Sequence, residues 1–360
     1  MKIFLKLIKK ILSIQDIYFN KNIIGAKNTN KSKVKNVSIN KDQYWNIISK
    51  RIFEASNYND GKNFFQDPDV ILHLASENVN LGYKLINKIR SHSHGDEMLN
   101  KVRTPSWGSP FLLKKYPYLS PTTASHLVNL LSIEECFKKK INQFRSILDF
   151  GGGYGGLAQC INQLSNSINI SIVDIPDMIE VQKKYLSKTG FLNNINFYNN
   201  LNNLSDTQFE LFNASFSMSE VNLNERNYIK NFIEKNCSAV HIIFQENFNE
   251  IDNLSFFEHF ASELKLKNWE VSLINYKWYE WSNTKLLYGK NLSFLAGYRA
   301  YEGMGRPRWL RRFRKTHLEN ILPSYFGDFK GQRAFKIEIW HIRFLIFEKL
   351  GLILKRFVIF

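Results

Sequence analysis

The hydrophobic pattern of residues 141–297 alternates short apolar runs with stretches of helical period. Runs rich in Ile, Val, Leu and Phe predict strands near 147–150, 170–174, 195–198, 209–215, 239–245, 269–276 and 286–297. Most of the gaps between them have the pattern of helices. Because parallel strands need helical crossovers, this alternation predicts an α/β fold with a parallel sheet that is covered by helices on both faces.

Residues 42–140 precede the first predicted strand and have a mainly helical pattern. Ser120 followed by Pro121 is typical of a helix start, since serine caps the first turn and proline suits the first helical position. We expect that helix to continue to about residue 139. A helical region of this length, placed before the sheet, is suited to form a cap that helps to cover a substrate.

Charge divides the chain further. The 49 Lys and Arg residues against 32 Asp and Glu give a net charge of +17. Residues 1–50 hold 11 basic and 2 acidic side chains and residues 298–360 hold 14 and 5, so each end contributes +9 while the middle is nearly neutral. We therefore divide the chain into four parts. They are a basic amphipathic segment and linker (1–41), a helical cap or substrate region (42–140), an α/β domain (141–297) and a basic, aromatic extension (298–360).

The basic ends suit an anionic surface. Residues 1–12 would place apolar side chains on one helix face beside lysines, and residues 306–314 set arginines between bulky apolar residues. The chain start lacks the apolar core of a signal peptide, and no apolar run near either end is long enough to span a bilayer. We expect a cytoplasmic protein that binds peripherally to the inner face of the membrane; the alternative is that both ends pack on the domain. No nucleic-acid recognition module accompanies the arginines, so nucleic acid is not an expected partner. The sequence does not indicate an oligomeric state.

Neither the cysteines nor the histidines form a recognised metal or redox motif. Cys136, Cys160 and Cys237 are far apart and include no CxxC pair, which excludes a disulfide scaffold or zinc ribbon and fits a reducing compartment. His92 and His94, followed by Asp96 and Glu97, could hold a divalent ion. A polar loop of this kind is more typical of solvated surface, and we predict no metal site.

A glycine-rich turn is the most informative feature. Residues 146–157 read Ser-Ile-Leu-Asp-Phe-Gly-Gly-Gly-Tyr-Gly-Gly-Leu, so an apolar strand runs into five glycines and then a helix. Such a turn bends tightly, lets the backbone approach a ligand and aims N–H groups at it. Gly151 and Gly153 begin both GxGxxG, with Gly156, and GxGxG, with Gly155. The spacing is therefore compatible with a dinucleotide and with S-adenosylmethionine.

Of two carboxylates near the turn, one distinguishes these ligand classes and the other is compatible with both. Asp149 lies at the strand end, two residues before the first glycine, where it would repel a pyrophosphate but could meet the cationic amino group of a methionine moiety. Asp174 ends the next strand, where a carboxylate can accept ribose hydroxyls in either class. We therefore favour S-adenosylmethionine. An NAD-dependent dehydrogenase acting on a sugar or alcohol is the alternative enzyme, and a non-catalytic interaction protein with the same fold is the alternative of another class.

Three segments together resemble a known family. They are Asp-Phe-Gly-Gly-Gly-Tyr-Gly-Gly-Leu-Ala (149–158), Asp-Ile-Pro-Asp (174–177) and Ser-Phe-Ser-Met-Ser-Glu (215–220). They resemble the sugar O-methyltransferases of bacterial surface-glycan clusters and, more broadly, class I S-adenosylmethionine-dependent methyltransferases. The resemblance covers about residues 100–297. It implies a Rossmann-like fold with a seven-stranded mixed sheet, and methyl transfer to a hydroxyl of a sugar or glycan precursor.

The resemblance also implies roles for single residues. Asp149, Gly151, Gly153 and Gly155 would line the methionine end, Asp174 the ribose, Ile175 the adenine ring, and Asn199 or Asn200 the adenine edge. These positions fit a donor that lies across the carboxyl ends of the strands.

The residues themselves suggest where the acceptor is activated. Glu220 follows the fourth predicted strand, at the sheet edge where ligands bind, and we predict that it is the general base or accepts a hydrogen bond from the sugar. A carboxylate that merely favours a helix N-terminus is the alternative. Glu246, after the fifth strand, is a second candidate with an expected structural role. His126 could face the donor pocket, and His241 is expected in the core.

Overall fold

A computed structural model describes residues 41–248, 251–278 and 283–293. The chain divides into two units, Met1–Leu292 and Ser293–Phe360, and the described residues lie almost entirely in the first. The predicted basic segments at both ends, the arginine cluster of residues 306–314 and the aromatic residues Tyr279 and Trp281 lie outside the described residues.

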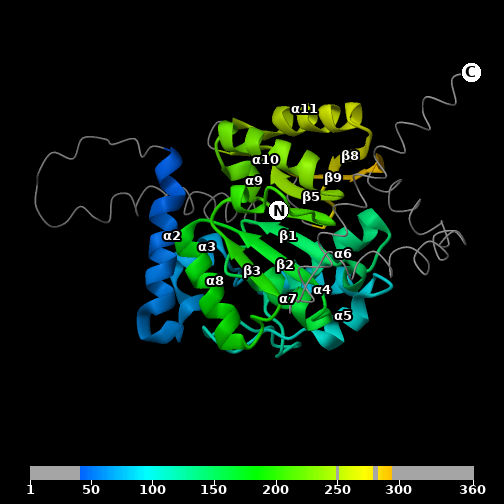
Figure 1. The fold of residues 1–360 in the computed structure, drawn as a ribbon. Helices are drawn as coiled ribbons and strands as arrows, with labels where there is room; N and C mark the ends of the chain where they lie inside the picture. The colour runs from blue at the N-terminus through cyan, green and yellow to red at the C-terminus, as the bar shows by residue number, and fades with distance from the viewer. Residues whose placement is uncertain (1–40, 249–250, 279–282, 294–360) are drawn as a thin grey trace, which may run out of the picture. The chain divides into compact units, whose positions relative to one another are not determined.

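A seven-stranded sheet forms the centre of the described unit (Figure 1), in the order β3-β2-β1-β4-β5-β9-β8. The strands are β1 (Ser146–Phe150), β2 (Asn169–Val173), β3 (Ile195–Tyr198), β4 (Leu211–Ser215), β5 (Ala239–Gln245), β8 (Trp269–Asn275) and β9 (Thr284–Asn291). The first five are parallel, and β9 runs antiparallel to both β5 and β8. This is the Rossmann-like, mixed seven-stranded sheet of class I methyltransferases, and it confirms the predicted fold class.

The pattern of apolar runs placed all seven strands but not all of their directions. Alternation alone predicted a parallel sheet, whereas the last strand in sequence, β9, inserts antiparallel between β5 and β8. The reason is the connection: only residues 276–283 separate β8 from β9, and so short a link favours an antiparallel neighbour. The final strand also ends at Asn291 rather than residue 297. A two-stranded ribbon, β6 (Asn247–Phe248) with β7 (Ile251–Asp252), was not predicted.

Helices cover both faces of the sheet, as expected. Along β1, Ile147 belongs to the apolar cluster formed with α6 (Pro121–Phe137), α7 (Gly156–Leu164) and α8 (Pro176–Thr189). Leu148 and Phe150 belong to the cluster formed with α10 (Leu223–Asn236) and α11 (Asn253–Leu266). This division follows from the alternation of side chains along a strand. Residues at the carboxyl ends of β1, β2 and β4 line a cavity to which α6, α8 and α10 also contribute.

The region before the sheet is helical, as predicted, and shares a hydrophobic cluster with the sheet. Its helices before α6 are α2 (Lys41–Asn57), α3 (Pro68–His73), α4 (Val79–Arg90) and α5 (Gly95–Lys101). The Ser120 side chain accepts a 3.0 Å hydrogen bond from the Thr123 N–H, which confirms the predicted cap of α6. The helix ends at Phe137, two residues earlier than expected, because Lys138 is left-handed (φ +52°). Helix α2 lies beside α8 (Figure 1).

A membrane-spanning helix must be long and predominantly apolar. Between residues 41 and 293, apart from the short gaps, no helix combines the length and apolar character that a membrane span requires.

Candidate functional site

The glycine turn lies between β1 and α7. Two observations explain why it needs glycine. Gly151 and Gly153 have φ of +72° and +58°, a region that side chains with a Cβ rarely adopt. A Cβ at Gly151 would also lie 2.2 Å from the Ser217 Cβ. At Gly153 the nearest atom to such a Cβ would be Leu74 Cδ2 at 3.7 Å, so the backbone there faces open space. The backbone of the turn thus lines an open cradle, formed by Gly151, Gly152 and Gly153, that a ligand can approach closely.

Gly155 does not line that cradle, which departs from the prediction. It begins α7 with φ +93°, and a Cβ there would lie 3.1 Å from Leu186 of α8. Its conformation and its packing against a helix explain the glycine. Gly152 takes its place at the cavity, beside Gly151 and Gly153.

Tyr154 anchors the turn to the N-terminal helical region. Its ring centroid lies 4.9 Å from those of Phe65 and Tyr185, both edge-on. Its hydroxyl lies 3.2 Å from His126 Nε2. His126 lines the cavity, as the sequence suggested, and burial lowers its pKa to about 4, so the imidazole is neutral at physiological pH. The aromatic contacts fix the turn in place without occupying the cradle.

Asp149 lies at the end of β1 and faces the cavity although it is only 3% exposed. The Asn213 amide donates a 2.8 Å hydrogen bond to Oδ1. Asn213 in turn accepts from His241 Nδ1 (3.1 Å), and His241 Nε2 lies 3.0 Å from the Ser132 hydroxyl. His241 is therefore a satisfied core residue, as expected. Burial raises the pKa of Asp149 to about 6, against the opposing effect of Asn213, and no cationic side chain among the described residues pairs with it.

Asp174, one residue after β2, is the second carboxylate of the cavity and is partly buried. It accepts hydrogen bonds from the Ile175 N–H (2.8 Å) and from Gln182 Nε2 (2.7 Å). Burial raises its pKa to about 7, with the charge of Asp149 adding to the shift. Gln182 Nε2 also donates to the Gly153 carbonyl, while its Oε1 is buried without a partner. One buried and one partly buried carboxylate beside a glycine cradle fit a cationic, hydroxyl-bearing ligand such as S-adenosylmethionine.

The cavity that these residues share has a volume of ≈ 1050 Å³, at the upper end of the range for small-molecule sites. It brings together most of the residues predicted from the sequence: Asp149, Gly151, Gly153, Asp174, Ile175, Asn199, Asn200 and Glu220. The Asn200 side chain accepts a 2.8 Å hydrogen bond from the Asn202 N–H and so caps a short helical turn. A site of this size accommodates a nucleoside donor together with an acceptor.

Glu220 ends the short helix α9 (Ser217–Glu220), directly after β4, and lines the same cavity. Burial raises its pKa, against the opposing effects of hydrogen bonds from Gln245 and Trp45. Phe216, just before α9, has φ +70°, a conformation that costs about 1–3 kcal/mol in a non-glycine residue. Such strain is typical of functional turns.

Arg226 holds the backbone around Glu220. The guanidinium is fully buried and donates to the carbonyls of Ser219 and Val221, the residues on either side of Glu220. It also donates to Asn253 Oδ1 (2.7 Å), at the start of α11. Burial lowers its pKa to about 10, so it remains cationic. This contact fixes the position from which Glu220 enters the cavity.

Other candidates from the sequence lie elsewhere. Glu246 forms a 2.8 Å ion pair with Lys285 and does not line the cavity, which agrees with the expected structural role.

The N-terminal helices contribute cavity residues that sequence reasoning missed. Trp45 of α2, His73 of α3, and Thr122 and Asn129 of α6 all line it. A helical cap had been expected, but no local pattern marks which of its side chains turn inward.

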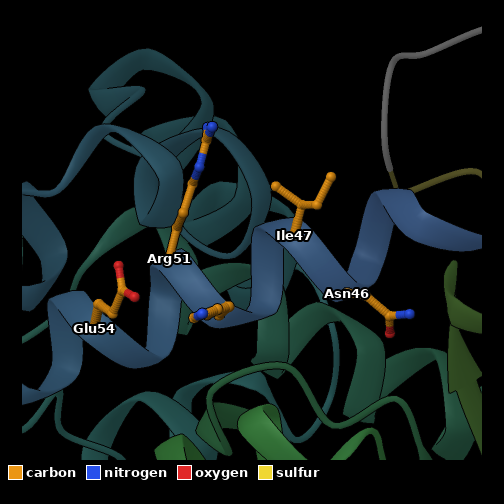
Figure 2. Close-up of a pocket in the computed structure, with 5 residues that line it drawn as sticks. Asn46, Ile47, Arg51 and Glu54 are labelled. Carbon is orange, nitrogen blue, oxygen red and sulfur yellow. The ribbon is translucent and has the colours of Figure 1, made fainter. Parts of the chain in front are cut away.

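A smaller cavity of ≈ 420 Å³ lies along α2 and is lined by Asn46, Ile47, Lys50, Arg51 and Glu54 (Figure 2). All five come from a single helix, and Figure 2 shows Ile47 and Arg51 projecting to the same side of it. Neither the glycine turn nor Asp149 and Asp174 line this smaller cavity. The larger cavity is therefore the candidate active site.

The raised pKa values predict how donor binding changes with pH. Because Asp149 and Asp174 have pKa values of about 6 and about 7 in the folded protein, both gain protons as pH falls through that range. A cationic donor requires the charged carboxylate, so we expect protonation of Asp149 to lower the donor affinity about tenfold between pH 7 and pH 5, and protonation of Asp174 to lower it further. The free energy of unfolding of the ligand-free protein should change in the opposite sense, because the folded state retains protons that the unfolded state has lost. Calorimetric titration and thermal melts across pH 5–7 measure both.

Comparison with known proteins agrees with this site. Residues 123–200 match the model of an O-methyltransferase domain. Similar solved structures include mitomycin 7-O-methyltransferase MmcR (10% identity, 69% of this chain and 68% of that chain covered, TM-score 0.36). Another is an O-methyltransferase family protein from Burkholderia thailandensis (11%, 61% and 74%, 0.36). No curated protein matches the sequence.

The domain match and the cavity agree on the reaction. The match covers most of α6, the glycine turn, Asp149 and Asp174. The chain is an S-adenosylmethionine-dependent O-methyltransferase, and the alternative of an NAD-dependent dehydrogenase is not supported.

Proposed function

We propose that this methyltransferase transfers the methyl group to a hydroxyl of a sugar or glycan precursor, such as those of bacterial surface polysaccharides. The observation that carries the proposal is the polar character of the cavity around Glu220. Besides this carboxylate, Asn222, Gln245 and Asn283 line that part of the cavity, and Trp45 contributes an aromatic ring. Sugar rings present several hydroxyls that need hydrogen-bond partners and an apolar face that stacks on aromatic rings.

We also propose how the chain's residues divide the work. S-adenosylmethionine supplies an activated methyl group, so the protein contributes mainly by positioning the reactants. Asp149 binds the cationic amino group of the methionine moiety, and Asp174 accepts hydrogen bonds from the ribose hydroxyls. The glycine turn lets the ligand approach the backbone closely. Ile175 and Asn200 lie toward the base.

Glu220 carries the remaining step in this proposal. A sugar hydroxyl is a weak nucleophile at neutral pH, and Glu220 accepts its proton as the new C–O bond forms. Its partly desolvated carboxylate, with a raised pKa, is a stronger base than an exposed one. Asp149 and the neutral His126 lie at the donor side and take no proton from the acceptor.

The test is methyl transfer from labelled S-adenosylmethionine to a panel of acceptors. Nucleotide-activated sugars, free sugars and small phenols are incubated with the enzyme, and products are identified by mass spectrometry. Transfer to a sugar hydroxyl supports the proposal. Transfer to phenols alone contradicts the sugar assignment but leaves the O-methyltransferase activity intact, while no turnover with any acceptor favours an interaction protein that has kept the fold.

We further propose that the basic ends hold the enzyme near an anionic membrane surface. The support is the charge of +9 at each end, in residues 1–50 and 298–360. Flotation with liposomes that contain anionic lipid should recover the full chain in a salt-sensitive way, and less of a chain truncated at either end. Equal recovery with neutral liposomes would rule this attachment out.

A further inference from the structure

Two imidazoles and a carboxylate meet at the end of α6 that lies away from the cavity. His92 and His94 belong to the turn between α4 and α5, and Glu134 belongs to α6. His94 Nδ1 lies 3.0 Å from Glu134 Oε2, and one ligand atom from each of the three residues falls within 4.8 Å of the others. The site joins residues 40 positions apart in the sequence.

Hydrogen bonds to His92 and to Glu134 each leave one ligand atom of the side chain available to the cluster. The His94 N–H donates to His92 Nδ1 (3.2 Å), which leaves His92 Nε2. The Ile141 N–H donates to Glu134 Oε1 (2.7 Å), which leaves Oε2 facing His94. Hydrogen bonds of this kind, which orient a ligand from behind, are the usual support of metal-binding histidines and carboxylates.

The burial of the Glu134 and His92 side chains, and the charges around them, also suit a bound cation. The Glu134 side chain is 6% exposed and that of His92 is 14% exposed. Among the described residues, the groups that pair with Glu134 are an imidazole and a backbone N–H rather than a Lys or Arg. Glu135, next along α6, lies 4.0 Å from His92 Nε2 and is paired with Lys277 at 2.8 Å. The nearly buried Glu134 carboxylate thus has an imidazole rather than a Lys or Arg as its side-chain partner, an arrangement that suits a shared cation.

We propose that His92, His94 and Glu134 bind one divalent transition-metal ion of the zinc type. Two imidazoles and one carboxylate are a common ligand set for zinc, with a fourth position open to water. Bonds of about 2.0–2.1 Å in a tetrahedral site place ligand atoms about 3.3 Å apart, so side-chain rotations that close gaps of up to about 1.5 Å complete the site.

The proposed ion has a structural role. Asn129 is the residue of α6 nearest to Glu134 that lines the active-site cavity, and Glu134 lies five residues further on, about 7.5 Å along the helix axis. None of the three ligands lines that cavity. The ion would fasten the α4–α5 turn to α6, the helix that carries Thr122, His126 and Asn129 into the active site. This proposal does not depend on the identity of the acceptor.

Metal binding to the full chain, expressed without a polyhistidine tag and stripped with a chelator, tests the proposal. Titration with ZnCl₂ should give one site per chain and raise the melting temperature by several degrees, and Co²⁺ should give the visible absorption of a tetrahedral complex. His94→Ala and Glu134→Gln should each weaken binding at least tenfold. His259→Ala is the matched control, because His259 also contacts a carboxylate (Glu263, 2.9 Å) but belongs to no such cluster of three.

The outcomes are distinct. Should Glu134→Gln fail to fold, His92→Ala replaces it, since that side chain lies in a turn. Binding that is absent in the wild type, or equally strong in the His94→Ala and His259→Ala variants, overturns the proposal. In that case the His94–Glu134 contact is a hydrogen bond that fixes the turn and nothing more.

Discussion

Replacing Asp149 with asparagine should abolish most donor binding while leaving the protein folded. The substitution keeps the shape of the side chain and its hydrogen bond from Asn213, but removes the buried negative charge. Loss of one partner of a buried, hydrogen-bonded charge pair costs about 2–5 kcal/mol, so the affinity for S-adenosylmethionine should fall at least about 30-fold. Isothermal titration with the donor and with its demethylated product measures the change.

Stability should move in the opposite direction. A pKa raised from 3.8 to about 6 means that keeping the Asp149 charge in the ligand-free protein costs about 3 kcal/mol near neutral pH. Asp149→Asn removes that cost, so its ligand-free melting temperature should equal or exceed that of the wild type. Asp206→Asn, an exposed carboxylate outside the cavity, is the control and should change neither quantity. Unchanged donor affinity in Asp149→Asn would contradict the assigned role.

Local features of the sequence identified the donor half of the site. A strand ending in Asp149, a run of glycines and a second strand before Asp174 are consecutive in the chain, and parallel strands bring their carboxyl ends together. Glycine spacing was less informative, because Gly151, Gly153 and Gly155 all have positive φ and yet only the first two line the cavity. Which glycine faces a ligand depends on what packs behind it, such as Leu186 at Gly155, and this is not a local property.

Features that join distant segments could not be predicted in the same way. The antiparallel insertion of β9 depends on its pairing with β5 as well as with β8. Trp45 reaches Glu220 from a helix about 175 residues earlier, and Glu134 meets His94 across 40 residues. The apolar pattern identified the strand at β9 and a mainly helical region before the sheet but none of these partners, since periodicity shows which face is buried and not what covers it.

The acceptor half of the site can be tested most directly at Glu220. Glu220→Gln retains the size and hydrogen-bonding capacity of the side chain but cannot accept a proton, so we expect the turnover number to fall by about 10²- to 10⁴-fold. Donor affinity should change little, because Asp149 and Asp174 are untouched. Initial rates at saturating donor, together with donor titrations, separate the two effects.

The pH profile distinguishes a base from a structural carboxylate. Since burial raises the pKa of Glu220, the wild-type rate at saturating donor should fall on the acid side as Glu220 gains a proton, and under the same conditions this limb should be missing from the residual activity of Glu220→Gln. Glu246→Gln tests the other carboxylate that follows a strand and should keep nearly full activity, because Glu246 pairs with Lys285 outside the cavity. Turnover of Glu220→Gln within about threefold of wild type would mean that Arg226 and the strained turn at Phe216 position Glu220 only to bind the acceptor. Proton removal would then fall to solvent.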